Sequence, residues 1–113
     1  MTALLDESVP FRLSRKLAER GCMVAGFPND WKGLKNGELL QRLREREIAC
    51  LVTCDKNLRY QQRIAASGIG LVVLPRQRFG DLMPFLDSIV EAVASVRPGN
   101  VLTVTPDGKI SSD

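Results

Sequence analysis

The stretches Leu4-Leu5-Asp6-Glu7 and Leu51-Val52-Thr53-Cys54-Asp55 decide the fold class, because each is a short apolar run that leads into an acidic residue. Short runs that are apolar throughout are typical of parallel strands covered on both faces. In an open α/β sheet, parallel strands end at one carboxyl edge, which is where such sheets bind their ligands. If both runs are strands of one sheet, Asp6 and Asp55 lie at that edge.

Outside these two runs, strand and helix patterns alternate along the chain. Strands are predicted over residues 3–5, 22–27, 48–53 and 69–74, and helices over residues 11–20, 36–46, 58–66 and 81–96. Asn36 is a candidate N-cap for the second helix, and Gly21 a candidate C-cap for the first. This alternation predicts a three-layer α/β/α sandwich with a mainly parallel sheet and right-handed crossovers.

Two C-terminal features are candidates for a partner surface. Residues 81–96 have the clearest helical period in the chain, and this apolar helix either fills the core or offers a homodimer or partner surface. Residues 101–105, the turn Pro106-Asp107-Gly108 and residues 109–110 predict a C-terminal β-hairpin at an edge of the sheet or against a partner.

Length and composition indicate one soluble domain. The 113 residues are enough for a single core and one site, so residues 1–113 are treated as one domain. No apolar stretch approaches the roughly 20 residues needed to cross a bilayer. Asp6 and Glu7 interrupt the first apolar run too early for a signal peptide, so a cytoplasmic location without membrane contact is expected.

The absence of histidine excludes several classes of catalyst. There is no imidazole for serine or cysteine triads, for metal ligation or for acid/base catalysis. The three cysteines lack the paired spacing of a zinc module and are expected to be reduced packing residues. Carboxylate, lysine and arginine chemistry remains, and the net charge of +3 is compatible with a phosphate-backbone partner.

Carboxylates that converge on one edge favour a metal site. They repel one another unless a proton or a hard cation relieves the repulsion. Magnesium and manganese prefer oxygen ligands of this kind. The residues themselves therefore predict Mg²⁺ or Mn²⁺ at the edge that holds Asp6 and Asp55.

Three phrases in order give the chain a family resemblance. They are Leu4-Leu5-Asp6-Glu7-Ser8-Val9-Pro10, then Asn36-Gly37-Glu38-Leu39-Leu40, then Leu51-Val52-Thr53-Cys54-Asp55-Lys56-Asn57. Together, over residues 3–75, the sequence resembles the small DUF5615-type PIN-like proteins, which are relatives of the PIN-domain ribonuclease toxins of toxin-antitoxin pairs.

This resemblance implies a metal-dependent endoribonuclease inhibited by a small cognate antitoxin protein. It implies that Mg²⁺ or Mn²⁺ activates water against a phosphodiester of RNA, which is chemistry that needs no histidine. Asp6 would be the central ligand, Glu38 and Asp55 would complete the catalytic acids, and Glu7 would ligate the metal directly or through water.

Two amides depart from the family pattern. Asn36 stands where the family usually has aspartate, and Asn57 stands where it often has a second acid. An amide oxygen can coordinate a cation but brings no negative charge, so the site should hold its ion more weakly. The alternative function is therefore a catalytically inactive PIN-like module that binds RNA or an antitoxin-like protein.

Basic and aromatic residues near the predicted edge are candidates for nucleic-acid binding. A phosphate backbone would be held by Arg12, Lys32, Lys35, Lys56 and Arg59. Trp31 and Tyr60 could stack on unpaired bases, with Trp31 the better candidate. The alternative is an ordinary solvated surface for the cations and burial under the loop for Trp31.

Each acid also has a simpler interpretation. Asp6 could cap the helix that begins near Pro10, Asp55 could cap the helix after its strand, and Glu38 could be a solvated first-turn glutamate. A receiver-like phosphorylation domain is a third hypothesis, ranked last because Leu74-Pro75 stands where that fold has a hydroxyl.

Overall fold

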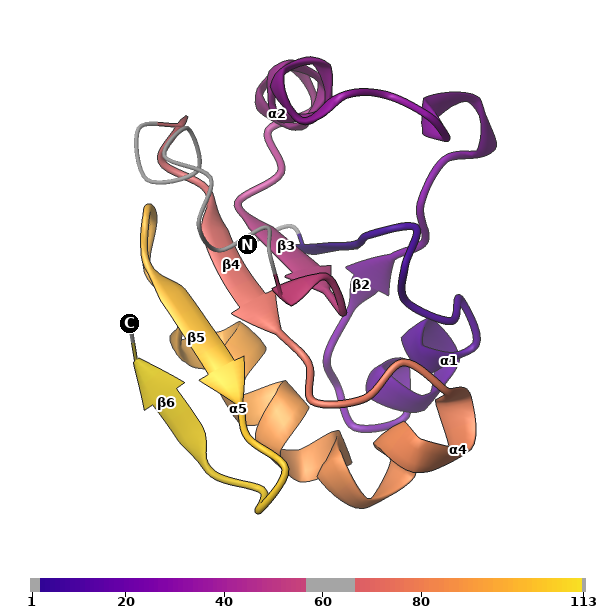
Figure 1. Ribbon diagram of the computed structural model, residues 1–113, viewed down its shortest axis with the longest axis vertical. Coiled ribbons are helices and arrows are strands. Elements are labelled where there is room, and N and C mark those ends of the chain that lie inside the picture. Colours follow the sequence, from indigo (N-terminus) through magenta and orange to yellow (C-terminus); the bar gives the residue numbers. More distant parts are fainter. Residues whose placement is uncertain (1–2, 57–66, 113) are drawn as a thin grey trace.

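A mainly parallel sheet runs through the centre of the molecule (Figure 1). The computed structural model describes residues 3–56 and 67–112, apart from the side chain of Asn36, and in this part the sheet has six strands in the order β2-β1-β3-β4-β5-β6. The strands are β1 (Ala3–Leu5), β2 (Val24–Ala25), β3 (Cys50–Thr53), β4 (Gly70–Val73), β5 (Val101–Val104) and β6 (Ile110–Ser112). Among these described strands, only the β5–β6 pair is antiparallel. The predicted α/β class with a mainly parallel sheet is confirmed.

Helices cover both faces of this sheet. They are α1 (Leu13–Ala18), η1 (Asn29–Trp31), α2 (Asn36–Glu45), α4 (Phe79–Leu82), η3 (Met83–Phe85) and α5 (Leu86–Ser95). Buried residues of α1, α4 and α5 form one core cluster with the sheet, and those of η1 and α2 form the other. Figure 1 shows α2 apart from α1, α4 and α5, which lie together.

The side chains of the central strands alternate between the two cores. In β3, Cys50 and Val52 join the cluster of α1 and α5, whereas Leu51 joins the cluster of α2. All four residues of β3 are buried, as are all four of β4. Alternation without a polar face is the arrangement of a parallel sheet covered on both sides, which explains the continuous apolar runs in the sequence.

The predicted single helix over residues 81–96 is wrong, because it is broken at Pro84. The chain forms α4, then the 3₁₀ turn η3, then α5. Proline has no backbone N–H and obstructs the preceding turn, so the helix cannot continue through it. Leu82 and Ile89 are nevertheless fully buried, so the apolar face of this segment fills the core.

Other predicted boundaries shift by a few residues. The strand predicted over residues 22–27 is only Val24–Ala25, because it lies at the sheet edge and pairs on one side. Lys35, rather than Asn36, is the N-cap of α2. Glu19 is the C-cap of α1, and Gly21 continues that turn with a φ of 78° while its amide donates to the carbonyl of Ala18. The helix predicted over residues 58–66 lies outside the described residues.

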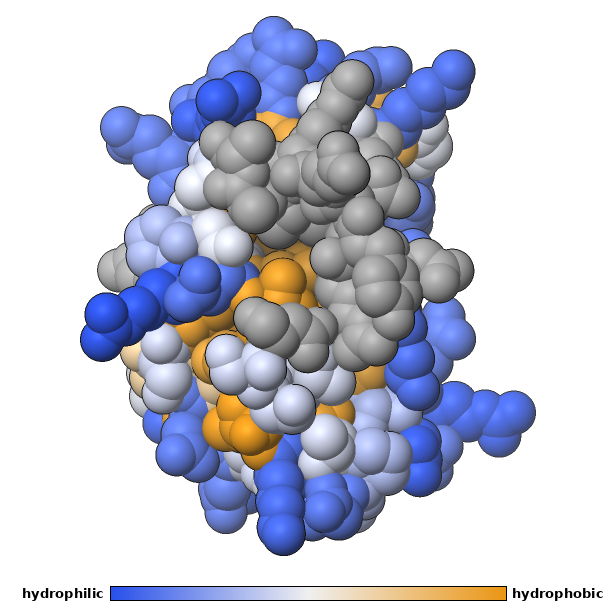
Figure 2. Space-filling model, turned by 60° about the vertical axis from the view of Figure 1, so that its left-hand side comes forward, coloured by the Kyte–Doolittle hydropathy of each residue, from blue (hydrophilic) through white to orange (hydrophobic). Residues whose placement is uncertain are grey.

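The opposite edge of the sheet is the antiparallel pair β5–β6. Its register aligns Leu102 with Ser112 and Val104 with Ile110. Figure 2 shows the molecule turned to bring this side forward, with apolar side chains reaching the surface among polar ones. Within the described residues, no helix has the length and apolar character needed to cross a membrane.

Candidate functional site

The strand order reverses between β1 and β3, and this reversal creates the candidate site. From β1 the chain passes through α1 to β2 on one side, and it then returns to β3 on the other side. In open α/β sheets with this order, ligands bind outside the carboxyl ends of the strands at such a switch point. Asp6 follows β1 directly, Thr53 is the last residue of β3, and Asp55 lies two residues further on.

Two hydroxyl groups hold the carboxylate of Asp6 at the switch point. The Oδ2 atom accepts hydrogen bonds from Ser8 Oγ at 2.8 Å and from Thr53 Oγ1 at 2.9 Å. The backbone N–H of Asp6 donates to the carbonyl of Val52 at 2.7 Å. The carboxylate therefore has a fixed position relative to both strand ends.

The same hydroxyls also organise the loop after β3. The backbone N–H of Cys54 donates to Ser8 Oγ at 3.1 Å, and that of Asp55 donates to Thr53 Oγ1 at 3.0 Å. Each hydroxyl thus accepts from a loop amide while it donates its own proton to Asp6. Because charge-assisted bonds of this kind are stronger than neutral ones, the network fixes the loop that carries Asp55.

Asp6 is a buried acid whose partners, within residues 3–56 and 67–112, are hydroxyls rather than cations. It is 8 % exposed, and the ion pairs described in the structure join Lys16 to Glu19 and Arg20 to Asp87. Buried charges are normally paired with an opposite charge or bound to a metal ion. The carboxylate oxygens of Asp6 and Asp55 are the hard donors that Mg²⁺ and Mn²⁺ prefer, so this donor set fits such an ion.

The other predicted acids have exposed side chains. Glu7 is exposed beside Asp6, Asp55 is exposed after β3, and Glu38 is exposed in the first turn of α2. Among the described residues, no three histidine, cysteine or acidic side chains form a group that could hold a metal ion. Hydrogen bonds through Ser8 and Thr53 bring Asp6 and the loop of Asp55 together. Asn57 lies outside the described residues, and so does the side chain of Asn36.

The thiol nearest to Asp6 is held in its neutral form. Cys54 is partly buried, and its Sγ donates to the carbonyl oxygen of Arg76 at 3.1 Å. Burial, and then the negative charge of Asp6, raise the pKa of Cys54 to about 11. A thiol with this pKa is a poor nucleophile at neutral pH.

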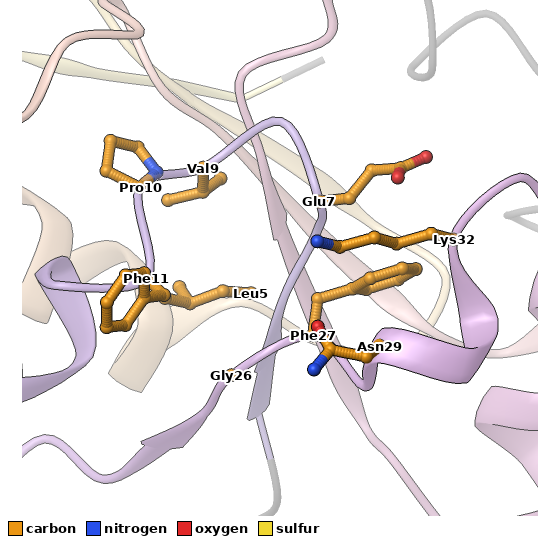
Figure 3. Close-up of a pocket in the computed structure, with 9 residues that line it drawn as sticks. All are labelled: Leu5, Glu7, Val9, Pro10, Phe11, Gly26, Phe27, Asn29 and Lys32. Carbon is orange, nitrogen blue, oxygen red and sulfur yellow. The ribbon is translucent and has the colours of Figure 1, made fainter.

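A pocket of about 610 Å³ opens beside the switch point, next to the ends of β1 and β2 (Figure 3). Glu7 and Lys32 lie at one end of it, and Pro10 and Phe11 lie at the other. Phe11 is 76 % exposed, which is unusual for a large apolar side chain. The pocket therefore offers both charged and aromatic surface close to Asp6.

The predicted backbone-binding cations are at the surface where the structure describes them. Arg12, Lys32, Lys35 and Lys56 are all exposed. Arg12 also stacks on an aromatic ring, with its guanidinium carbon 4.3 Å from the ring centroid of Phe79. Arg59 and Tyr60 lie outside the described residues.

Of the two interpretations of Trp31, base stacking and burial under the loop, the structure supports burial. Its side chain is only 2 % exposed and belongs to the core cluster of α2. It meets Phe27 edge-on, with ring centroids 6.1 Å apart, and the guanidinium of Arg46 lies 5.3 Å from its ring centroid. These contacts hold the ring in the core, so Trp31 is not available to stack on bases.

Sequence reasoning missed the two hydroxyls that hold Asp6. Thr53 is completely buried at the end of an apolar strand, and a buried hydroxyl needs a partner. This signal could have identified Thr53, whereas no comparable pattern in the sequence marks Ser8 as a partner of Asp6. The N-cap of α1 is Arg12, so Asp6 does not cap that helix.

No family model, curated protein or solved structure matches this chain.

Proposed function

We propose that this protein is a PIN-like endoribonuclease that uses Mg²⁺ or Mn²⁺ at the switch point of its sheet. The observation that carries the proposal is the buried carboxylate of Asp6, which two hydroxyls orient and which no described cation neutralises. The order of acids in the sequence, with Asp6 after the first strand and Asp55 after the third, supports the same function.

In this proposal each residue near the switch point has a distinct role. Asp6 and Asp55 would hold the ion, with Glu7 contributing directly or through water. The ion would supply charge neutralisation at the phosphate and a bound water of lowered pKa. Thr53 and Ser8 orient the Asp6 carboxylate, while Lys32 and Lys56 would hold the RNA backbone.

A second function remains, and a specific observation favours it. Glu38 does not join a metal-binding group with Asp6 and Asp55 in the described part of the chain, and Asn36 brings no charge to α2. A site with two acids should hold its ion weakly. The second candidate is therefore an inactive PIN-like module that binds RNA or a small antitoxin-like protein without cleavage.

Cleavage of a labelled single-stranded RNA in the presence of Mn²⁺ tests the first function against the second. We expect products with the wild-type protein, none after addition of EDTA, and none with Asp6→Asn or Asp55→Asn. Asp81→Asn is the matched control, because Asp81 is an exposed acid on α4 that should leave cleavage unchanged. Wild-type protein that binds the RNA and leaves it intact would instead establish the binding module.

A further inference from the structure

Phe11 separates two open pockets, and this arrangement suggests a path for a ligand. On one side is the pocket with Glu7 and Lys32, which also contains Leu5 at the end of β1 (Figure 3). On the other side is a second pocket of about 590 Å³ along α1, lined by Arg12, Arg15, Lys16 and Phe79, among others. Because Phe11 lines both, the two pockets are neighbours at this residue.

We propose that these two pockets form one groove for single-stranded nucleic acid, with an unpaired base stacked on Phe11 and the backbone held by the flanking cations. This inference rests on the proposed function, because it specifies which form of RNA would reach the switch point. It also assigns Phe11, Arg15 and Phe79, which sequence analysis did not connect with binding.

The first argument is the exposure of an aromatic ring among cations. Within the described residues, Phe11 and Met23 are the large apolar side chains that lie mostly in solvent. Exposing such a ring has a cost unless a partner covers it. Bases of single strands stack on aromatic rings whatever the sequence, while cations track the backbone phosphates.

The second argument is the flat surface that Arg12 makes with Phe79. The guanidinium lies 4.3 Å from the ring centroid, so its position is set by this stacking as well as by charge. Bases also stack on guanidinium planes. A base on Phe11 and a neighbouring base on Arg12 would therefore continue the path from one pocket to the next.

The third argument is charge. The two pockets together contain the cations Arg12, Arg15, Lys16 and Lys32 against the carboxylates of Glu7 and Glu19. Glu19 is already paired with Lys16 at 3.7 Å. The excess of cations complements a polyanion.

These features fit a single strand better than an acidic amphipathic peptide or a duplex. A helical peptide binds through several apolar anchors along one stripe, whereas this groove exposes one large apolar side chain, Phe11. A duplex keeps its bases stacked on one another, so it would use the cations and leave Phe11 uncovered.

The test is binding of a fluorescein-labelled oligouridylate of about ten nucleotides, measured by anisotropy in EDTA. EDTA removes metal-dependent cleavage, so binding is read separately from catalysis. We expect Phe11→Ala to weaken binding by about tenfold, because it removes one stacked base. We expect Arg12→Ala and Arg15→Ala each to lower the slope of log affinity against log salt by about 0.7.

Two control variants match these changes in chemistry but lie outside the groove. Met23→Ala removes the other exposed large apolar side chain, and Arg44→Ala removes an exposed arginine on α2. Both should bind the oligonucleotide like the wild type. Thermal melting of Phe11→Ala should be unchanged, since its ring is 76 % exposed.

Three results would overturn the groove. They are wild-type affinity in Phe11→Ala, equal affinity for a duplex of the same length, and binding of a labelled oligoglutamate peptide in place of the RNA. The outcome is separable from that of the proposed function. Phe11-dependent binding without cleavage would reject the nuclease and keep the groove, whereas Asp6-dependent cleavage without a Phe11 effect would do the reverse.

Discussion

The hydroxyl of Thr53 donates a hydrogen bond of 2.9 Å to the carboxylate of Asp6, and this contact joins residues 47 positions apart in the chain. It connects the carboxyl ends of β1 and β3, which are adjacent parallel strands. The position of the candidate site therefore depends on this buried contact, and on the hydrogen bonds of Ser8, as well as on the sheet order.

Thr53→Val tests the contribution of this contact to stability. Valine has nearly the same shape but cannot donate to Asp6 or accept from the amide of Asp55. We expect a loss of about 1–3 kcal/mol in the free energy of unfolding, measured by urea denaturation. Thr103→Val is the matched control, because the buried Thr103 hydroxyl has no partner among the described residues and its removal should be neutral or stabilising. Equal losses in both variants would contradict this assignment.

Gly70→Ala tests the close packing of β4 against the end of α5. A Cβ at this position would lie 3.0 Å from Cγ2 of Val96 and 3.1 Å from the carbonyl oxygen of Arg97. We expect destabilisation of about 1–3 kcal/mol, because neither neighbour can move freely. Gly80→Ala serves for comparison, since its Cβ would meet nothing within 4 Å and α4 should gain about 0.5–1 kcal/mol. Indistinguishable effects of the two variants would mean that the packing at Gly70 is loose.

The buried thiols should make stability fall at alkaline pH. Burial raises the pKa of Cys50 from 9.0 to about 12 and, together with the charge of Asp6, that of Cys54 to about 11. The folded state therefore retains these protons above pH 9 while the unfolded state loses them. The contribution of these protonated thiols to the free energy of unfolding is fully present below pH 9. It is lost as the pH rises through about 11 for Cys54 and about 12 for Cys50. Urea titrations across this range should show a decline that is smaller in Cys50→Ala, and an unchanged slope in that variant would refute the assignment.

Slow thiol labelling provides an independent check of the same burial. Only the thiolate reacts with alkylating reagents, so the buried Cys50 should be labelled much more slowly than the half-buried Cys22 at pH 8. Mass spectrometry of partly labelled, digested protein would rank the sites, with urea-unfolded protein as the control in which they react alike. Faster labelling of Cys50 than of Cys22 in folded protein would contradict the burial described for β3.

Much of the site could be predicted because strand ends in a parallel sheet converge. Asp6 and Asp55 each follow an apolar run, so the sequence pattern alone predicted that both lie at the carboxyl edge of the sheet. Burial of Trp31 was one of the interpretations of the sequence, but its contacts with Phe27 and Arg46 could not be predicted, because only the tertiary fold creates them. The helix break at Pro84 could have been predicted, because proline has no backbone N–H. The apolar residues recur at helical spacing on both sides of Pro84, and this pattern favoured a single helix instead.

The most direct test of the central claim is a calorimetric titration of Mn²⁺ into wild-type protein and Asp6→Asn. Asparagine can still accept hydrogen bonds from Thr53 and Ser8 through its carbonyl oxygen, so the variant should stay folded, as circular dichroism would show. We predict saturable binding to the wild type and to Asp81→Asn, and its loss in Asp6→Asn. Equal binding by Asp6→Asn, or no binding to the wild type at millimolar Mn²⁺, would contradict a metal site at the switch point.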